Sequence, residues 1–182
     1  MIRVMRVFTT LGFLLAASAS LASGQFIEVP DWDNSVRFDL IASQDAVRPG
    51  DALELAVVAE IVPGYHLYGP EERKPSRTEV LVEGELIGSD EPVFPPVVTR
   101  NLLGLGEYDL YEGKIAIRIP VSVEEGAGLR QEVPISVRVN YQVCTNEACS
   151  APTHQTLSLV LPIVGEGTAV AATHADIFKP KD

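Results

Sequence analysis

The chain contains two cysteines, Cys144 and Cys149, within the stretch YQVCTNEACSAPTHQ. Five residue steps of extended chain would span about 16 Å, whereas disulfide-bonded residues have their Cα atoms about 4.4–6.8 Å apart. The segment Thr145-Asn-Glu-Ala must therefore turn back on itself for a bond to form, and Asn146 suits a turn. The pair predicts either a structural cross-link or a couple that exchanges disulfides with other proteins.

A disulfide across such a short loop stabilises a fold only weakly. The chain-entropy model gives roughly 2 kcal/mol, before any strain is subtracted. The apolar strands described below supply a core without it, which favours a bond that opens and closes. Many secreted domains nevertheless carry one inert disulfide, and this spacing is less specific than Cys-x-x-Cys beside a βαβ unit. The spacing by itself leaves both interpretations open.

A metal site is a third interpretation of the same residues. Cys144, Cys149 and His154 form a C-x4-C-x4-H pattern, and two thiolates with an imidazole can hold copper or zinc. The spacings are wider than in common zinc knuckles, and no fourth ligand is evident. We therefore expect no metal and no other cofactor, and the metal site remains an alternative.

The first 24 residues have the features of a secretory signal peptide. Arg3 and Arg6 precede an apolar run from Val7 to Ala17, and small residues follow in ASASLASG. This run is shorter than the roughly 20 apolar residues that cross a bilayer, so we expect cleavage rather than a retained anchor. The cysteines would then lie in a periplasmic compartment where thiols are oxidised.

The formal net charge of −11 indicates an acidic surface. Such a surface repels nucleic acid phosphates and anionic lipid. No second apolar segment of the sequence is long enough to cross a bilayer. We therefore expect a monomer that neither binds nucleic acid nor inserts into a membrane.

The remainder of the chain shows the two-residue period of half-buried strands. In Lys114–Val123, for example, isoleucines and a valine occupy every second position, and Gly, Pro, Asn and Asp separate such segments. The predicted strands are Val36–Ala42, Ala52–Val62, Thr78–Ile87, Lys114–Val123, Val133–Val143 and Leu157–Ile163.

About seven short strands in one domain predict an all-β fold, an immunoglobulin-like antiparallel β-sandwich, with a closed barrel as the alternative. The expected divisions are a signal peptide (1–24), one domain (25–165) and a loosely ordered C-terminal tail (166–182). Within the domain, Glu91–Gly106 is rich in Pro, Gly and Leu, and we expect a long functional loop there rather than a strand. Thr168–Phe178 could form a helical turn or two.

Three blocks of the sequence resemble the N-terminal periplasmic domain of the thiol:disulfide interchange protein DsbD family. YQVCTNEACSAPTHQTLSLVLPI resembles the family's Tyr-Gln-x-Cys strand, short loop, second Cys, Pro and final apolar strand. PGYHLYGPE, at Pro63–Glu71, resembles its Gly-Tyr-x-Leu-Tyr segment. YDLYEGKIAIRIPV, at Tyr108–Val121, resembles the block after its cap loop. Together the blocks extend over about residues 30–164.

The resemblance implies a function in thiol–disulfide exchange. Members of the family take electrons from a membrane-embedded thiol-transporting protein and pass them to thioredoxin-like or other disulfide-containing periplasmic proteins through mixed disulfides. By resemblance, Cys149 attacks the client and Cys144 resolves the mixed disulfide. The alternative is an immunoglobulin-like binding module whose disulfide is purely structural.

The family also covers its cysteines with a loop that bears an aromatic residue. Beside a thiol, a histidine can lower the pKa of the thiol and raise its thiolate fraction. The candidates for shielding the cysteines or for contacting a partner are His66, Tyr68, Leu103, Leu105 and Tyr141.

The sequence departs from the family in three respects. Better-known members have one more residue between the cysteines. Their cap loop carries an acidic pair and aromatics, where this chain has Asn101-Leu-Leu-Gly-Leu-Gly. Their chain continues into a membrane domain and a thioredoxin-like domain, so we expect a stand-alone secreted protein whose electron donor is a separate polypeptide.

Overall fold

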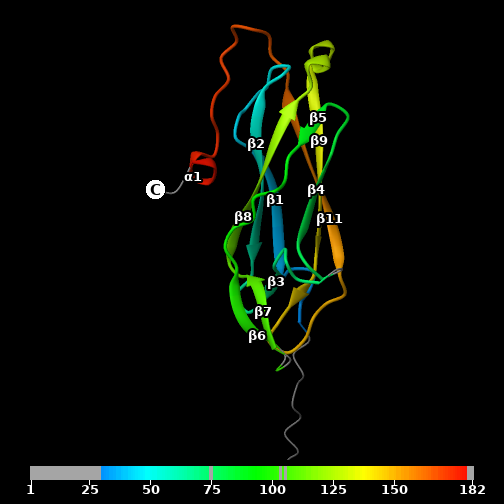
Figure 1. The fold of residues 1–182 in the computed structure, drawn as a ribbon, viewed down its shortest axis with the longest axis vertical. Coiled ribbons are helices and arrows are strands. Elements are labelled where there is room, and N and C mark those ends of the chain that lie inside the picture. The colour runs from blue at the N-terminus through cyan, green and yellow to red at the C-terminus, as the bar shows by residue number, and fades with distance from the viewer. Residues whose placement is uncertain (1–29, 74–75, 103, 105, 180–182) are drawn as a thin grey trace, which may run out of the picture.

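The computed structural model describes residues 30–73, 76–102, 104 and 106–179, and strands dominate this part of the chain (Figure 1). The elements are β1 (Val36–Ala42), β2 (Ala52–Ile61), β3 (His66–Tyr68), β4 (Glu79–Glu83), β5 (Ile87–Ser89), β6 (Val98–Leu102), β7 (Gly106–Tyr111), β8 (Lys114–Val123), the 3-10 helix η1 (Glu125–Leu129), β9 (Glu132–Tyr141), β10 (Val143–Cys144), β11 (Thr153–Pro162) and the helix α1 (Ala175–Phe178).

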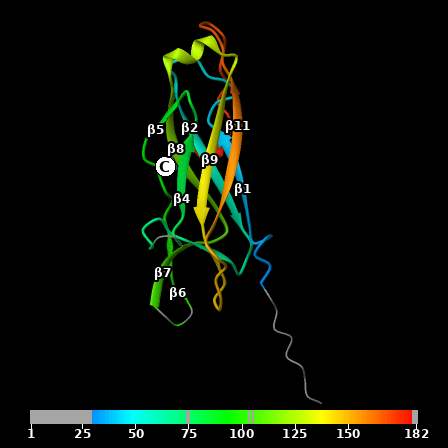
Figure 2. The same cartoon turned by 90° about the vertical axis from the view of Figure 1, so that its right-hand side faces the viewer.

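Two sheets pack face to face and enclose the main core (Figure 2). One has the strand order β1-β2-β8-β5 and the other has the order β11-β9-β4. The alternating residues of the sequence point inward: Ile117 and Ile119 on β8, and Val137 and Val139 on β9, are all 0% exposed. The predicted all-β, immunoglobulin-like antiparallel sandwich is confirmed.

A third sheet, ordered β10-β3-β7-β6, continues the sandwich at its lower end in Figure 1. Neighbouring residues of β3 show that this sheet has a different hydrophobic cluster on each of its faces. Leu67 joins the main core, whereas Tyr68 belongs to a second, smaller cluster on the opposite face. That second face carries the cysteines.

The alternating pattern locates strands well but does not identify their partners. The predicted strands Val36–Ala42 and Lys114–Val123 coincide with β1 and β8. The single strand predicted at Thr78–Ile87 is wrong, because β4 ends at Glu83 and β5 begins at Ile87. β4 pairs with β9 and β5 pairs with β8, so the chain crosses from one sheet to the other between them.

The expectation that Glu91–Gly106 contains no strand is also wrong. β6 pairs with β7 in antiparallel register from Val98↔Leu110 to Leu102↔Gly106. The prolines of this segment end at Pro96, which leaves the following residues free to join a ladder. Gly104, with φ 65°, adopts the left-handed conformation that a tight reversal requires.

The strand predicted at Val133–Val143 is divided in two. β9 ends at Tyr141 and pairs with β11 and β4, whereas β10 begins at Val143 and pairs with β3. The chain therefore changes sheets at Gln142. β11 begins at Thr153, before the predicted Leu157, because its pairing with β9 extends to Tyr141.

Hydrogen bonds hold Ala171 and Thr173 against the domain, and the loose order expected for the tail (166–182) stays a prediction. The Thr173 N–H donates to the Ser43 carbonyl over 2.9 Å, and the Thr173 hydroxyl donates to the Ala42 carbonyl over 2.6 Å. The Asp45 N–H and the Ala171 carbonyl lie 3.1 Å apart, and the Asp45 carboxylate accepts the Ala171 N–H over 2.9 Å. These bonds fasten the segment beside the end of β1.

The helical segments of the described chain are short. α1 covers Ala175–Phe178, within the stretch where a turn or two was predicted. In the part of the chain that the structure describes, no helix is long and apolar enough to cross a bilayer.

A pair of matched substitutions tests the position of the core. Val137 is 0% exposed and Val160 is 50% exposed. We expect Val137→Ala to lower the free energy of unfolding by about 2 kcal/mol, because buried methyl groups are lost, and Val160→Ala to change it by less than about 0.5 kcal/mol. Urea unfolding measures both values, and equal losses would contradict the described sandwich.

Candidate functional site

Cys144 and Cys149 form a disulfide at the lower end of the molecule, where the chain leaves β10 and returns toward β11 (Figure 1). Their Cα atoms lie 4.0 Å apart. The intervening residues therefore double back completely, as the sequence requires for a bond between these two cysteines.

Hydrogen bonds within the loop hold this reversal independently of the sulfur–sulfur bond. The Thr145 N–H donates to the Ala148 carbonyl over 2.8 Å, and the Thr145 hydroxyl accepts the Ala148 N–H over 3.1 Å. The Ser150 N–H donates to the Val143 carbonyl over 2.8 Å, and the Gln142 side chain donates to the Ser150 carbonyl over 2.7 Å. The backbone thus places the two cysteines opposite each other as an isolated antiparallel bridge.

The two cysteines differ in exposure. Cys144 is 1% exposed and belongs to the small cluster formed with Tyr68 and Leu110. Cys149 is only partly buried and packs against the edge of that cluster. A second protein that approaches this end of the molecule therefore meets Cys149 before Cys144.

Tyr68 contacts the more exposed cysteine. Its hydroxyl lies 3.8 Å from Cys149 Sγ, and it is the donor because a disulfide sulfur carries no hydrogen. Its ring packs edge-on against Tyr108, with 5.5 Å between the ring centroids. Burial raises the pKa of Tyr68, and the neighbouring Tyr108 and Glu72 raise it further, so the hydroxyl keeps its proton at neutral pH.

His66 is the residue of β3 directly opposite Cys144 in the pairing of β3 with β10. It is 5% exposed. Its Nδ1 atom lies 3.7 Å from Glu112 Oε1, whereas its Nε2 atom is buried without a hydrogen-bond partner. The sequence suggested His66 through its place in PGYHLYGPE, and the structure brings it beside the cysteines.

Glu112 is in turn bound to Arg100 on β6. The guanidinium donates to the two carboxylate oxygens over 3.1 and 3.2 Å. This hydrogen-bonded guanidinium lowers the pKa of the Glu112 carboxyl, which is therefore ionised at neutral pH. The result is a polar row that extends from Cys144 through His66 to Glu112 and Arg100.

Sequence reasoning missed Glu112 and Arg100. Tyr108, Leu110 and Glu112 alternate along the chain, and this period could have placed the first and last on one face. Arg100 was passed over because its segment was predicted to be a loop.

The other predicted shielding residues are placed differently. The Tyr141 ring packs against Phe38 with 4.8 Å between centroids and joins the main core, and a contribution of Tyr141 to shielding remains a prediction. Leu103 and Leu105 lie outside the described residues.

The third residue of the C-x4-C-x4-H pattern, His154, is exposed on β11 and pairs with Asn140. Both sulfurs are engaged in the disulfide. Within residues 30–73, 76–102, 104 and 106–179, no group of three or more His, Cys, Asp or Glu side chains is arranged to hold a metal ion. Among the described residues, no further side chain is therefore placed to complete a metal site with Cys144, Cys149 and His154.

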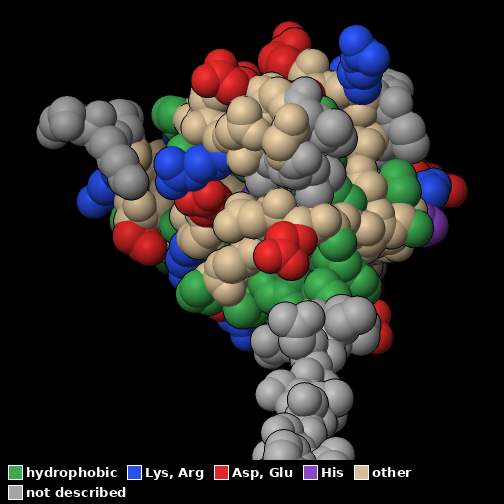
Figure 3. Space-filling view, turned by 90° about the horizontal axis from the view of Figure 1, so that it is seen from below, with side chains coloured by type: hydrophobic (Ala, Val, Ile, Leu, Met, Phe, Trp, Pro, Cys, Tyr) green, Lys and Arg blue, Asp and Glu red, His purple; other side chains and the backbone are tan. Residues whose placement is uncertain are grey.

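A hollow of about 500 Å³ adjoins the tyrosine pair. Its lining residues are Tyr68, Glu72, Arg73, Ser76, Gly106, Glu107 and Tyr108. Seen from this end of the molecule, backbone and uncharged polar groups cover much of the surface, with separate acidic side chains and a hydrophobic area on one side (Figure 3). The hollow leaves open space beside the residues that flank Cys149.

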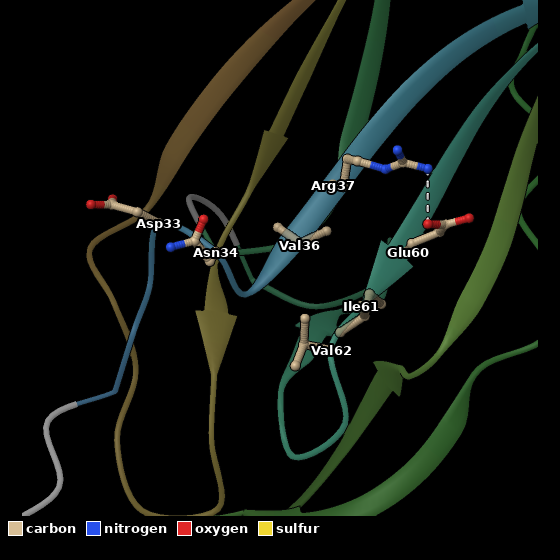
Figure 4. Close-up of a pocket in the computed structure, with 7 residues that line it drawn as sticks. All are labelled: Asp33, Asn34, Val36, Arg37, Glu60, Ile61 and Val62. Carbon is tan, nitrogen blue, oxygen red and sulfur yellow. Dashed lines mark hydrogen bonds and ion pairs between the residues drawn. The ribbon is translucent and has the colours of Figure 1, made fainter.

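A second hollow, of about 580 Å³, lies along β1 and β2 (Figure 4). Its one basic residue, Arg37, is already paired with Glu60 over 3.0 Å and with Asp39 over 3.2 Å. None of its lining residues is a cysteine or a histidine. This hollow therefore offers neither a thiol nor an imidazole for a reaction.

The fold and the site are those of an immunoglobulin-like β-sandwich domain with a disulfide at one end. A family model described as "Thiol:disulfide interchange protein DsbD, N-terminal" matches residues 37–161, and the chain belongs to this family. Thiol–disulfide exchange is the activity that characterises the family.

Two solved structures are similar to this chain at low sequence identity. The N-terminal periplasmic domain of ScsB from Proteus mirabilis is 12% identical, with a TM-score of 0.46 over 73% of this chain and 49% of that chain. The reduced form of the Neisseria meningitidis DsbD N-terminal domain is 14% identical, with a TM-score of 0.38 over 73% of this chain and 89% of that chain. The chain thus spans about half of the ScsB structure. No curated protein matches the chain.

Reduction of the disulfide tests whether the loop holds its own shape. We expect reduction to lower the free energy of unfolding by roughly 2 kcal/mol, because the closed loop is short, and to leave the far-ultraviolet circular dichroism unchanged. Urea unfolding with and without a phosphine reductant measures this, and the Cys144→Ala/Cys149→Ala variant, which the reductant should not affect, is the control. Unfolding on reduction would show that the bond is a required cross-link.

Proposed function

We propose that this protein carries reducing equivalents in the periplasm, from a membrane-embedded thiol-transporting protein to oxidised client proteins. The observation that carries the proposal is the disulfide between Cys144 and Cys149 inside the segment that matches the family. Removal of residues 1–24 during export would deliver the domain to that compartment.

The exchange proceeds through two mixed disulfides. A donor thiolate attacks the sulfur of Cys149, and Cys144 leaves as a thiolate that takes up a proton. A second donor thiolate then attacks the mixed disulfide, which frees Cys149 and oxidises the donor. The protein now holds two thiols, and the donor has lost two electrons.

Delivery to the client reverses these roles. The Cys149 thiolate attacks a client disulfide, and the released client thiolate takes up a proton. The Cys144 thiolate then attacks Cys149 and displaces the second client sulfur. The intramolecular disulfide forms again, and the client has gained two electrons and two protons.

The difference in exposure supports this division of roles. Cys144 is 1% exposed, whereas Cys149 is only partly buried and lies beside the Tyr68 hydroxyl. An intermolecular attack needs an accessible sulfur, and an intramolecular attack needs only a near neighbour. Thioredoxin-like proteins and other disulfide-containing periplasmic proteins are the clients that this chemistry suits.

Capture of partners tests the proposal directly. In cells, Cys144→Ala should accumulate a mixed disulfide through Cys149, because the sulfur that resolves it is missing. Non-reducing electrophoresis followed by mass spectrometry measures this. Cys149→Ala is the matched control and should capture far less, since Cys144 is buried. If neither variant captures a partner, the proposal fails.

The reduction potential tests the same proposal in isolation. A carrier that must be reduced by a partner should have a potential above about −300 mV, whereas structural disulfides typically lie below this value. Equilibration in dithiothreitol redox buffers measures the potential. A value far below about −300 mV, together with strong destabilisation on reduction, would instead favour a binding module with a structural disulfide.

A further inference from the structure

The polar row beside the disulfide has a role within the exchange, and this inference rests on the proposed function. We propose that His66 is the base and acid for Cys144: it takes the proton of the Cys144 thiol before that sulfur attacks, and returns it when Cys144 leaves as a thiolate. Glu112 and Arg100 act through His66 as positioning residues.

The register of the lower sheet places His66 correctly for this role. Cys144 and His66 are direct partners in the antiparallel pairing of β10 with β3. Directly opposite residues point to the same face of a sheet, with Cβ atoms about 4.5–5.5 Å apart. Both residues are buried, at 1% and 5% exposure, so bulk water does not compete for the proton.

The unpartnered nitrogen of His66 is the second observation. Nε2 is buried and has no hydrogen-bond partner while the disulfide is present. Buried polar groups normally have one, so this exception calls for an explanation. The disulfide sulfur of Cys144 carries no hydrogen to donate, but reduction converts it to a thiol that can donate to Nε2. The Cys144 thiol becomes this partner when reduction lets it move toward Nε2, because the two atoms are not hydrogen-bonded in the disulfide state.

Glu112 and Arg100 decide which nitrogen of the His66 ring carries the proton. Glu112 directly follows Tyr111, whose partner on β3 is Leu67, so Glu112 and Cys144 flank His66 from opposite sides of β3. The Glu112 carboxylate, 3.7 Å from Nδ1, favours a proton on that nitrogen and leaves the Nε2 lone pair free. Arg100 keeps Glu112 ionised, so the carboxylate can also stabilise the imidazolium that forms.

The proton and the electrons balance in each direction. When Cys149 is joined to a client, the Cys144 thiol transfers its proton to Nε2, and the resulting thiolate displaces the client sulfur as a thiolate. The imidazolium proton then passes to solvent or to that departing thiolate. When a donor thiol reacts with Cys149, the proton that the donor sulfur loses passes to Nε2 of the neutral ring. The donor thiolate then attacks Cys149, the bond to Cys144 breaks, and the imidazolium gives this proton to the Cys144 thiolate.

Several ionisable groups lie near His66. Cys144 faces it from β10, Glu112 from the end of β7, and Arg100 from β6 through Glu112. Tyr68 lies two residues along β3 on the same face, and its hydroxyl is directed at Cys149. Glu112 is the anion in contact with the ring, and its removal should weaken the effect of His66.

Titration of the Cys144 thiol tests the inference. In the Cys149→Ala variant, Cys144 is the one remaining thiol, and its thiolate absorbance in the ultraviolet is followed against pH. Adding His66→Gln should raise the pKa of Cys144 and reduce its thiolate fraction at neutral pH by about tenfold, because the imidazolium partner is lost. Adding Glu112→Gln should shift the pKa in the same direction by a smaller amount.

Matched controls separate this effect from damage to the fold. His154→Gln in the same background should leave the Cys144 titration unchanged, because His154 is exposed on β11. In the Cys144→Ala background, His66→Gln should leave the Cys149 titration unchanged. If His66→Gln does not fold, as judged by circular dichroism, Glu112→Gln decides the question. An unchanged Cys144 pKa in the folded variants overturns the inference, and this outcome is independent of whether any partner is captured.

Discussion

The position of Cys144 depends on the residue at which the chain leaves one sheet and enters another. Up to Tyr141 the backbone is paired with β11 and β4, and from Val143 it is paired with β3. Gln142 stands at this junction, and its side chain also holds the returning strand through the Ser150 carbonyl. Because side chains alternate between faces, a shift of one residue at the junction would turn Cys144 into the main core and Val143 toward the second cysteine. The pairing of β10 with β3 thus decides where the sulfurs lie.

The surroundings of the sulfurs are drier than a position at the end of a sandwich suggests. Leu110 and Cys144 are 0% and 1% exposed, and the two tyrosines pack around the disulfide. Burial away from water disfavours a thiolate, while a nearby cation or proton acceptor favours it. A buried sulfur that must act as a nucleophile therefore needs a polar neighbour, and His66 is the neighbour that the sheet provides. The acidic surface and the Ile- and Val-rich core take no direct part in this balance.

Local patterns in the sequence predicted where many of the strands lie. They did not predict which strands pair with each other. Alternation located β1 and β8 to the residue, because each keeps one set of partners along its length. It merged β4 with β5 and β9 with β10, because the chain changes sheets while the same two-residue period continues. The cysteines were found from their spacing, and His66 and Tyr68 from a family motif. Arg100 and Glu112 could not be found in this way, because their significance comes from β6 and β7 folding against β3.

The self-supporting turn between the cysteines sets the conditions of any reaction at this end of the molecule. Thr145 and Ser150 hold the reversal through hydrogen bonds that do not involve the sulfurs. A sulfur freed from its partner stays tethered nearby, at an effective concentration that small thiols dissolved in the surrounding medium rarely reach. Under the proposed function, a covalent complex with another protein would therefore be short-lived, and its lifetime would be set by the chain itself rather than by the abundance of competing reductants.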